Sequence, residues 1–431
     1  MSRARTLAVV AIAGALVLAT GGGVALLESG RHGFVALACG QGVLYGIVAA
    51  MVLRHGLPRR ALLAGLAAAA LMRAIVVAAP PLLSDDVYRY VWDGRVEAAG
   101  INPYRYIPSD PALAALRDDA IYPNINRKDY ARTIYPPGAQ AIFFLVTRFG
   151  QSVLVMKLAM VGFEIAAVLL LLGMLRRAGL PAERVLLYAL HPLPVWEFAG
   201  SGHVDAAMIA LTVACLWLHQ RGGRATTGIA LAAAALVKPF PLALAPALYR
   251  RWDWRLPLAF AATVVLAYAP FVGVGAHVLG FLPAYLREEG LDSGIAFYPL
   301  WLARALLPVA IPSAAYVAAA ALALVGYGLA VLRRADGGAP WRDGLLLAAA
   351  LMFASSPHFT WYLAWLLPLA CLAPWLPALY IVSASPLLYL ALPFGLVGSI
   401  VYGGFAVLVL VDRFRPSALM IQEKSDVVGA G

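Results

Sequence analysis

Long uncharged apolar stretches alternate with short basic segments along almost the whole chain. The first stretch, 6–27, has 22 residues and no charge, and a helix needs about 20 residues to cross a bilayer. Signal peptides usually have a shorter apolar core followed by a cleavage site, so we interpret this stretch as a retained span. The stretches 33–53 and 61–83 predict the second and third spans, the third with Arg73 near its middle.

Shorter and proline-interrupted stretches occupy the middle of the chain. The stretch 134–149 is too short to cross comfortably and indicates an interfacial or half-membrane helix ahead of a full span at 153–175. Prolines interrupt the stretches 185–198 and 229–249, and proline removes a backbone donor and clashes with the preceding turn. We therefore expect broken helices there, which are tolerated at membrane depth where they are buried in protein or line a cavity.

The last apolar stretch, 359–411, has 53 residues without a charge and contains five prolines, which predict two or three spans. Together the stretches predict an all-α polytopic membrane protein with broken helices and a long first outer loop. We expect a bundle of about 11–13 transmembrane helices that forms a single integral membrane domain over 1–431.

Composition supports this fold class and excludes others. Hydrophobic residues make up 62% of the chain and charged residues only 13%, against about 25% charged in a soluble domain. An ordinary soluble enzyme is therefore excluded, and so is a disordered chain, because so much apolar surface does not stay solvated. The cysteines Cys39, Cys215 and Cys371 lie in apolar stretches and offer neither a disulfide framework nor a metal-binding spacing.

The net charge of +11, from 33 basic and 22 acidic residues, is a topology signal and does not indicate nucleic-acid binding. Basic residues gather in short loops, as the positive-inside rule describes for cytoplasmic loops. These basic segments are 54–60, 176–177, 221–224, 250–255, 333–342 and 413–415. With a cytoplasmic N-terminus, the loop 81–133 (eight acids, seven bases) and the loop 277–300 (three acids, one base) lie outside. The sequence thus predicts a multi-pass protein of a bacterial-type inner (plasma) membrane.

The long loop 81–133 has an unusual composition for a connector. It begins Ser84-Asp85-Asp86-Val87-Tyr88-Arg89-Tyr90-Val91-Trp92-Asp93-Gly94-Arg95, with two adjacent acids where the chain leaves the membrane. A carboxylate at this place can act as a general base for a hydroxyl nucleophile, and neighbouring aromatic rings suit the apolar faces of sugars. An aromatic belt with ordinary surface charges explains the same composition equally well.

This string resembles the GT-C superfamily of integral-membrane glycosyltransferases, in particular glycosyltransferase family 87 and related bacterial polyprenyl-phosphate-mannose-dependent mannosyltransferases. The resemblance extends from about residue 60 to about residue 410 and does not specify the sugar. Further matching strings are Gly100-Ile101-Asn102-Pro103-Tyr104, Ile134-Tyr135-Pro136-Pro137, Glu197-Phe198-Ala199-Gly200-Ser201-Gly202-His203-Val204-Asp205, Leu236-Val237-Lys238-Pro239 and Ser356-Pro357-His358-Phe359.

The resemblance implies an inverting hexosyltransferase with its active site in the first outer loop. The donor is expected to be a polyprenyl-phosphate sugar, and the acceptor an extracytoplasmic glycan or glycolipid. In such families an acid of this loop deprotonates the acceptor hydroxyl, and the matching positions here are Asp85 and Asp86. We favour Asp86 as the base, with Asp85 orienting it or contacting the acceptor.

Other ionisable residues are candidates because charged groups within a membrane are costly and usually face a cavity or a partner. Lys238, in a broken helix, can neutralise the donor phosphate or reach a lipid headgroup. His358 can hydrogen-bond the leaving phosphate or lie as a capped histidine at the interface. Arg89 can contact phosphate, although an ion pair with Asp86, Asp93 or Glu97 is the stronger interpretation.

The remaining candidates form a polar group and an aromatic pair. Glu197, His203 and Asp205 can contact substrate or brace the broken helices, and their spacing matches no zinc or calcium pattern. Tyr88 and Tyr135 belong to the matching strings as further substrate contacts. No motif requires a cofactor or a metal, and no nucleotide-binding motif suggests a sugar-nucleotide donor. Arg73 is more simply explained by an ion pair with an acid of a neighbouring helix.

Two hypotheses of different classes compete. A glycosyltransferase that moves a hexose, with mannose the expected one and arabinose left open, accounts for the acidic and aromatic outer loop. A secondary transporter or flippase of lipid-linked glycans also has broken helices with buried Lys, His and Glu, but the chain lacks the repeat symmetry that many transporters have. A ligase or polymerase of similar architecture is a third possibility.

Overall fold

The computed structural model describes residues 2–290, 292–334 and 340–414, and within these ranges the regular structure is helical without strands. This confirms the predicted all-α fold. Residue 291 of the second outer loop, and parts of the basic segments 333–342 and 413–415, lie outside the described residues.

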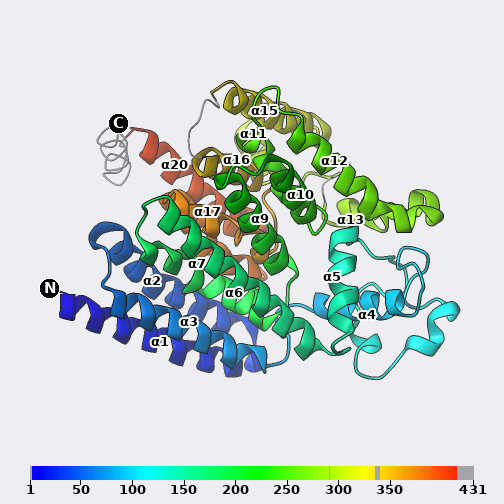
Figure 1. Cartoon of the computed structure of the whole chain (residues 1–431), viewed down its shortest axis with the longest axis horizontal. Coiled ribbons are helices and arrows are strands. Elements are labelled where there is room, and N and C mark those ends of the chain that lie inside the picture. The colour runs from blue at the N-terminus through cyan, green and yellow to red at the C-terminus, as the bar shows by residue number, and fades with distance from the viewer. Residues whose placement is uncertain (1, 291, 335–339, 415–431) are drawn as a thin grey trace.

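Three long helices form one side of the bundle, where α1 packs against both α2 and α3 (Figure 1). They are α1 (Ser2–Ser29), α2 (Arg31–His55) and α3 (Arg59–Val77). The prediction of a third span up to residue 83 is wrong at its end, since α3 stops at Val77. Pro80 and Pro81 follow, and a proline disfavours helical geometry in the residue before it.

The segment 78–147 follows α3 and comprises the loop 81–133 and the helix α5, which packs against α4 of that loop (Figure 1). Its elements are α4 (Asp86–Ala98), the short 3-10 helices η1 (Pro111–Leu116) and η2 (Tyr122–Asn124), and α5 (Pro137–Thr147). With 11 residues, α5 is too short to span a bilayer, as predicted for 134–149. The helix α6 (Val153–Arg177) is long enough to cross.

The middle of the chain is broken where the prolines predict it. Between α6 and α12 the elements are η3 (Ala182–Val185), α7 (Leu186–Ala189), α8 (Pro192–Pro194), the π-helix η4 (Val195–Gly200), α9 (Asp205–Gln220), α10 (Arg224–Ala235), η5 (Phe240–Leu244) and α11 (Ala245–Leu248). The segment α8–η4 and the helix α9 bend away from each other by 119°. The expectation of broken helices in 185–198 and 229–249 is confirmed.

The second half begins with a helical stretch of membrane length, Arg255–Glu288, which comprises α12, η6 and α13, and it ends in a divided apolar stretch. Its elements are α12 (Arg255–Tyr268), η6 (Ala269–Leu279), α13 (Leu282–Glu288), α14 (Tyr298–Leu306), α15 (Ser313–Arg334), α16 (Pro340–Ser355), η7 (Thr360–Leu363), α17 (Leu366–Leu372), α18 (Leu376–Ala384), η8 (Ser385–Tyr389), α19 (Phe394–Gly398), the π-helix η9 (Ser399–Gly403) and α20 (Gly404–Phe414).

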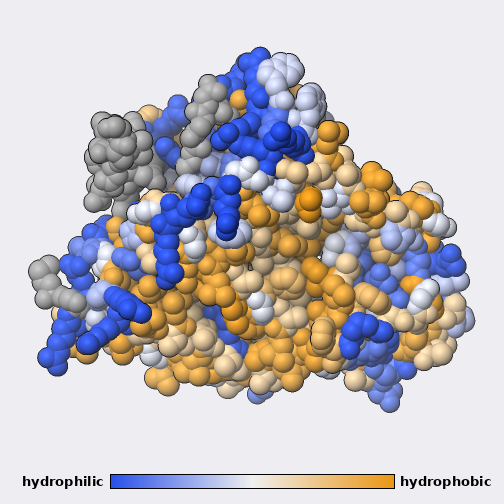
Figure 2. All heavy atoms as spheres, in the orientation of Figure 1, coloured by the Kyte–Doolittle hydropathy of each residue, from blue (hydrophilic) through white to orange (hydrophobic). Residues whose placement is uncertain are grey.

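The described residues contain seven helices long and apolar enough to cross a membrane, or eight if the bent pair counts as one span. The sequence-based number of about 11–13 is larger because it includes short and broken apolar segments. Apolar side chains cover the middle of the molecule, whereas polar side chains gather near the N-terminal end of α1, at the top, and around the loop after α4 (Figure 2). The chain is therefore a polytopic membrane protein.

Two buried cations join the spans to the broken segments. Arg73 of α3 forms an ion pair with Glu164 of α6, with 2.6 Å between the closest nitrogen and oxygen, and donates to the carbonyl of Ala189 at the end of α7. The ammonium of Lys157 donates to the carbonyls of Val76 and Ala79, where α3 ends. The expected pairing of Arg73 with an acid of a neighbouring helix is confirmed.

The substitution Glu164→Met should destabilise the protein strongly, because it leaves the guanidinium of Arg73 buried without a counter-charge. Breaking a buried ion pair in this way costs about 3–5 kcal/mol. The double variant Arg73→Met/Glu164→Met should be less destabilised than the single one. Thermal unfolding in detergent measures this, with the lipid-exposed Leu158→Met on the same helix as control. Equal melting temperatures for the single and double variants would contradict the role of the pair.

Candidate active site

The two adjacent acids of the outer loop lie at the start of α4. Asp86 is the first residue of the helix and Asp85 precedes it as the N-cap. The backbone N–H of Asp86 donates to the hydroxyl of Ser84 at 3.3 Å. A carboxylate at a helix N-terminus is favoured by the helix dipole and by the unpaired N–H groups of the first turn. The sequence therefore places two anionic groups where the backbone stabilises them.

A residue that the sequence analysis missed connects the two acids. The side-chain amide of Asn126 donates to Oδ1 of Asp85 and to Oδ1 of Asp86, each at 2.8 Å. Asn126 lies about forty residues further along the loop, and no spacing or motif in the sequence singles it out. It fixes the carboxylates side by side, with Asp85 exposed and Asp86 partly buried.

The bend between η4 and α9 brings a buried histidine to Asp86. Gly202 has φ +77, a left-handed conformation that glycine adopts without steric cost, and a Cβ there would lie 2.9 Å from the side chain of Val87 in α4. The next residue, His203, is fully buried, and its Nδ1 lies 3.8 Å from Oδ2 of Asp86. On its other side, Nε2 lies 3.6 Å from Oε2 of Glu197.

A buried cation lies in the same group of residues. Lys238, which follows the end of α10, places its Nζ 2.6 Å from Oδ2 of Asp205, the first residue of α9. The same ammonium lies over the ring of Tyr362, 4.4 Å from its centroid, in a cation–π contact. The backbone N–H of Ala139 in α5 donates to the carbonyl of Leu236, which ties this broken segment to the outer loop.

Electrostatics connects this cation with the acid of α4. Burial raises the pKa of Asp86, whereas the positive charge of Lys238 and the hydrogen bond from Asn126 act in the opposite direction. The structure thus brings Asp86, His203, Glu197, Asp205 and Lys238 together, from four separate parts of the chain. We call these five residues the polar cluster.

Other predicted site residues have structural partners. Arg89 forms an ion pair with Asp93 at 2.8 Å and donates to the carbonyl of Ala131, which is the interpretation that the sequence favoured. The ring of Tyr135 packs edge-on against Tyr90, while Tyr88 is partly buried against the core.

The contacts of His358 are with residues outside the polar cluster. Its ring packs against Phe394 of α19 at 4.2 Å between centroids, and it has a hydrogen bond with the backbone of Ala296. Burial lowers the pKa of this histidine. Its Nε2 is buried and has no hydrogen-bond partner among the described residues. The next aromatic residues of the same segment do reach the cluster, because Phe359 stacks on Trp361 and Trp361 stacks on His203.

The loop 277–300 contacts the same region through α13. Arg127 of the first loop forms an ion pair with Glu288 of α13 at 2.8 Å, and its guanidinium lies over the ring of Tyr285. The hydroxyls of Tyr285 and Tyr362 are 3.4 Å apart, so α13 contacts the aromatic side chain beside Lys238.

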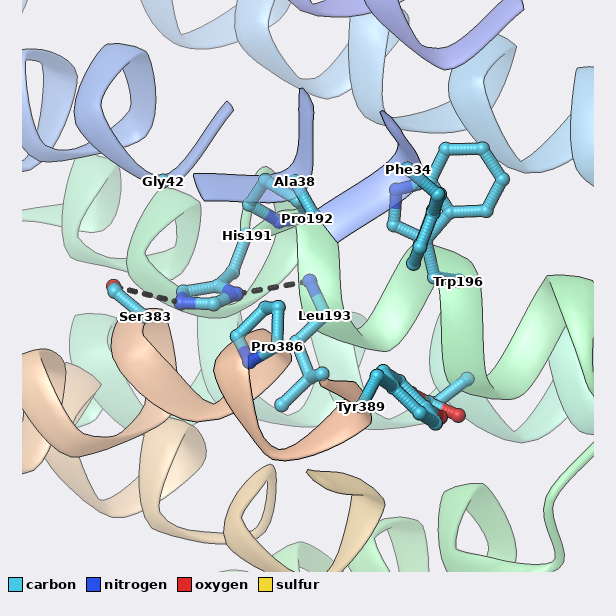
Figure 3. Close-up of a pocket in the computed structure, with 11 residues that line it drawn as sticks. Phe34, Ala38, Gly42, His191, Pro192, Leu193, Trp196, Ser383, Pro386 and Tyr389 are labelled. Atoms are coloured by element: carbon cyan, nitrogen blue, oxygen red, sulfur yellow. Dashed lines mark hydrogen bonds between the residues drawn. The ribbon is translucent and has the colours of Figure 1, made fainter. Parts of the chain in front are cut away.

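A small apolar pocket reaches the polar cluster at Glu197, and Tyr389 also lines this pocket (Figure 3). It lies between α2, the segment around His191 and the helix η8. The ring of His191 accepts a hydrogen bond from the N–H of Leu193 and contacts the hydroxyl of Ser383 at 3.2 Å. Within the described residues, no group of three or more His, Cys, Asp or Glu is arranged to hold a metal ion.

Comparison with protein families identifies the chain at the family level. Residues 6–253, more than half of the 431, match the family described as alpha-(1->6)-mannopyranosyltransferase, N-terminal domain. The chain belongs to this family. No curated protein and no solved structure matches it. The matched residues include Asp85, Asp86 and the other members of the polar cluster, so the cluster lies within the part of the chain that defines this mannosyltransferase family.

Family membership confirms the resemblance inferred from the motifs. The chain is therefore a membrane-embedded mannosyltransferase, which uses a sugar donor and a glycan acceptor. It also favours the transferase over the transporter as the function of the broken helices.

We predict that Gly138→Ala destabilises the mannosyltransferase and separates α5 from the segment that carries Lys238. A Cβ at Gly138 would lie 2.8 Å from the backbone carbon of Leu236, closer than side chains approach backbone, so one segment must move. Gly162→Ala in α6 is the matched control, because a Cβ there meets nothing within 4 Å. Melting temperatures in detergent compare the two variants, and an unchanged value for Gly138→Ala would argue against this close contact.

Proposed function

We propose that the protein transfers mannose from polyprenyl-phosphate mannose to a 6-hydroxyl of a glycan or glycolipid, at the extracytoplasmic face of the membrane. The observation that carries the proposal is the partly buried carboxylate of Asp86 beside the buried cation Lys238, in a family named for alpha-(1->6)-mannosyl transfer. A base and a cation in one site are what transfer from a phosphate to a hydroxyl requires.

The chemistry follows as a direct displacement with inversion. Asp86 accepts the proton of the acceptor hydroxyl, whose oxygen forms the bond to the anomeric carbon. The bond from that carbon to the phosphate oxygen breaks, and its electron pair leaves with the polyprenyl phosphate. Because a single displacement inverts the anomeric carbon, an alpha product requires a beta-linked donor.

Lys238 is the group suited to the phosphate. Its ammonium is already paired with Asp205, which holds it in place, and its position over Tyr362 leaves it next to the outer loops. A cation fixed before the reaction stabilises the charge that develops on the leaving phosphate without reorganising. Arg89 is held by Asp93, and the ring of His358 packs against Phe394, whereas Lys238 lies in the polar cluster with Asp86, so we assign the phosphate to Lys238.

The charge distribution supports the orientation. The loops 81–133 and 277–300 carry net charges of −1 and −2. Since the whole chain carries +11, the residues outside these two loops carry +14. Cytoplasmic loops carry the excess of Lys and Arg, so the acidic loops and the polar cluster face outside. The lipid tail of the donor then lies in the membrane, with its phosphate at the interface.

The substitution Asp86→Asn should reduce mannosyl transfer by about 100-fold or more, because an amide does not accept the hydroxyl proton. Asp85→Asn is the matched control and should lose less than about 10-fold, since Asp85 is exposed and shares only the contact with Asn126. Transfer of radiolabelled mannose from polyprenyl-phosphate mannose to octyl alpha-mannoside measures both variants. The opposite ranking would assign the base to Asp85.

The pH dependence should reflect the same carboxylate. Transfer needs ionised Asp86, so the rate should fall as the pH drops through the raised pKa of this group. Asn126→Leu removes a hydrogen bond that lowers this pKa, and the acid limb of the pH–rate profile should therefore move to higher pH.

Glu97→Gln is the control for this profile, because burial raises the pKa of Glu97 to about 7 on the same helix. The acid limb of the pH–rate profile of Glu97→Gln should stay in place if Asp86 alone controls the rate. An unshifted limb in Asn126→Leu would be evidence against Asp86 as the titrating base.

A further inference from the structure

His203 lies between two carboxylates and forms no hydrogen bond through either ring nitrogen among the described residues. Nδ1 is 3.8 Å from Oδ2 of Asp86, and Nε2 is 3.6 Å from Oε2 of Glu197. Both distances are somewhat longer than a hydrogen bond, in which donor and acceptor are at most about 3.2 Å apart. Buried ring nitrogens are normally paired, so an imidazole left between two anionic oxygens calls for an explanation.

The surrounding contacts hold this arrangement in place. The imidazole of His203 stacks on the indole of Trp361, with 3.8 Å between ring centroids. Glu197 is oriented through its other oxygen, Oε1, which accepts hydrogen bonds from the hydroxyls of Thr360 at 2.5 Å and Tyr389 at 2.6 Å. These two donors leave Oε2 of Glu197 buried, unpartnered and directed at the histidine.

We propose that His203 takes over the proton which Asp86 removes from the acceptor hydroxyl, and that Glu197 is the positioning residue that orients His203 for this transfer. The inference rests on the proposed transfer reaction and on Asp86 as its base. In the resting state, the carboxylate of Glu197 favours the tautomer with the proton on Nε2, which leaves the lone pair of Nδ1 facing Asp86. An oriented carboxylate fixes a histidine tautomer in the same way in hydrolase triads.

The proton balance is closed within the three residues. The acceptor O–H bond breaks, the proton passes to Asp86 and then to Nδ1, and the resulting imidazolium lies between two carboxylates. Asp86 is thereby an anion again when the phosphate leaves. After product release the proton returns through Asp86 to water. The two long contacts shorten when substrate binds, as catalytic hydrogen bonds often do.

Charged groups around this histidine come from four segments of the chain. Asp86 lies on α4, Glu197 on η4, Asp205 on α9 and Lys238 after α10, while η7 contributes the uncharged Trp361. Removing the negative charge of Glu197 therefore weakens proton binding by the group as a whole. A histidine that only fills space would not transmit such a change to the reaction.

The test is the pH–rate profile of the full-length protein in detergent, with polyprenyl-phosphate mannose and octyl alpha-mannoside. Glu197→Gln keeps an oxygen for Thr360 and Tyr389 but removes the charge. Its rate should fall by about 10-fold or more, and its acid limb should move by about one unit to lower pH. Glu197→Asp, which keeps the charge, should retain the limb of the original protein.

A second variant covers the case in which Glu197→Gln does not fold. His203→Phe keeps a ring on Trp361 but accepts no proton, and should lose about 10-fold or more in rate with an unchanged KM for the donor. The matched control is His191→Phe, which removes another buried histidine that contacts Ser383 and Leu193 (Figure 3). Its acid limb should not move.

The outcomes separate this inference from the proposed function. If the unmodified protein transfers mannose and Asp86→Asn does not, but Glu197→Gln and His203→Phe keep its rate and acid limb, the relay is wrong and the transferase stands. A uniform loss of rate with an unmoved limb in Glu197→Gln also overturns the relay. If Asp86→Asn retains full activity, the base assignment itself fails.

Discussion

Backbone groups released where helices break must find partners inside the apolar part of the protein, because no water is available there. Much of the buried polar architecture meets this requirement. Lys157 donates to carbonyls at the end of α3, Arg73 donates to the carbonyl of Ala189, and Tyr45 donates to that of Leu187. The cations that sequence hydropathy marks as costly are thus the groups that allow the helices to break.

The same breaks bring the reacting groups together. His203 and Asp205 lie where the chain bends by 119° into α9, and Lys238 lies in the proline-interrupted segment that follows α10. These two breaks present the three residues beside Asp86. Charged groups that face one another across a protein-lined site avoid most of the cost of lying in lipid. Fold and chemistry therefore depend on the same irregular backbone.

Much of the fold and of the candidate site was predictable from the sequence, and the remaining features were not predictable for identifiable physical reasons. Apolar length and proline position predict the spans, the short α5 and the broken segments, because these depend on local chemistry. The partner of Arg73 is also predictable in kind, since a buried cation needs an acid. The roles of Asn126 and Trp361 were not predictable, because they arise from contacts between residues far apart in the sequence. The contact of His358 with Phe394 is equally a property of tertiary packing.

The π-helix η4 sets a length constraint on the chain that carries Glu197. A π-helical turn holds one residue more than an α-helical turn, so losing any single residue from 195–200 would let the segment wind as an ordinary helix. The flanking segments would keep roughly their relative orientation, because the π-turn accommodates the additional residue, but the side chains within the turn would change direction. Glu197 would leave Thr360 and Tyr389, and insertions or deletions between 195 and 200 should be far less tolerated in evolution than substitutions.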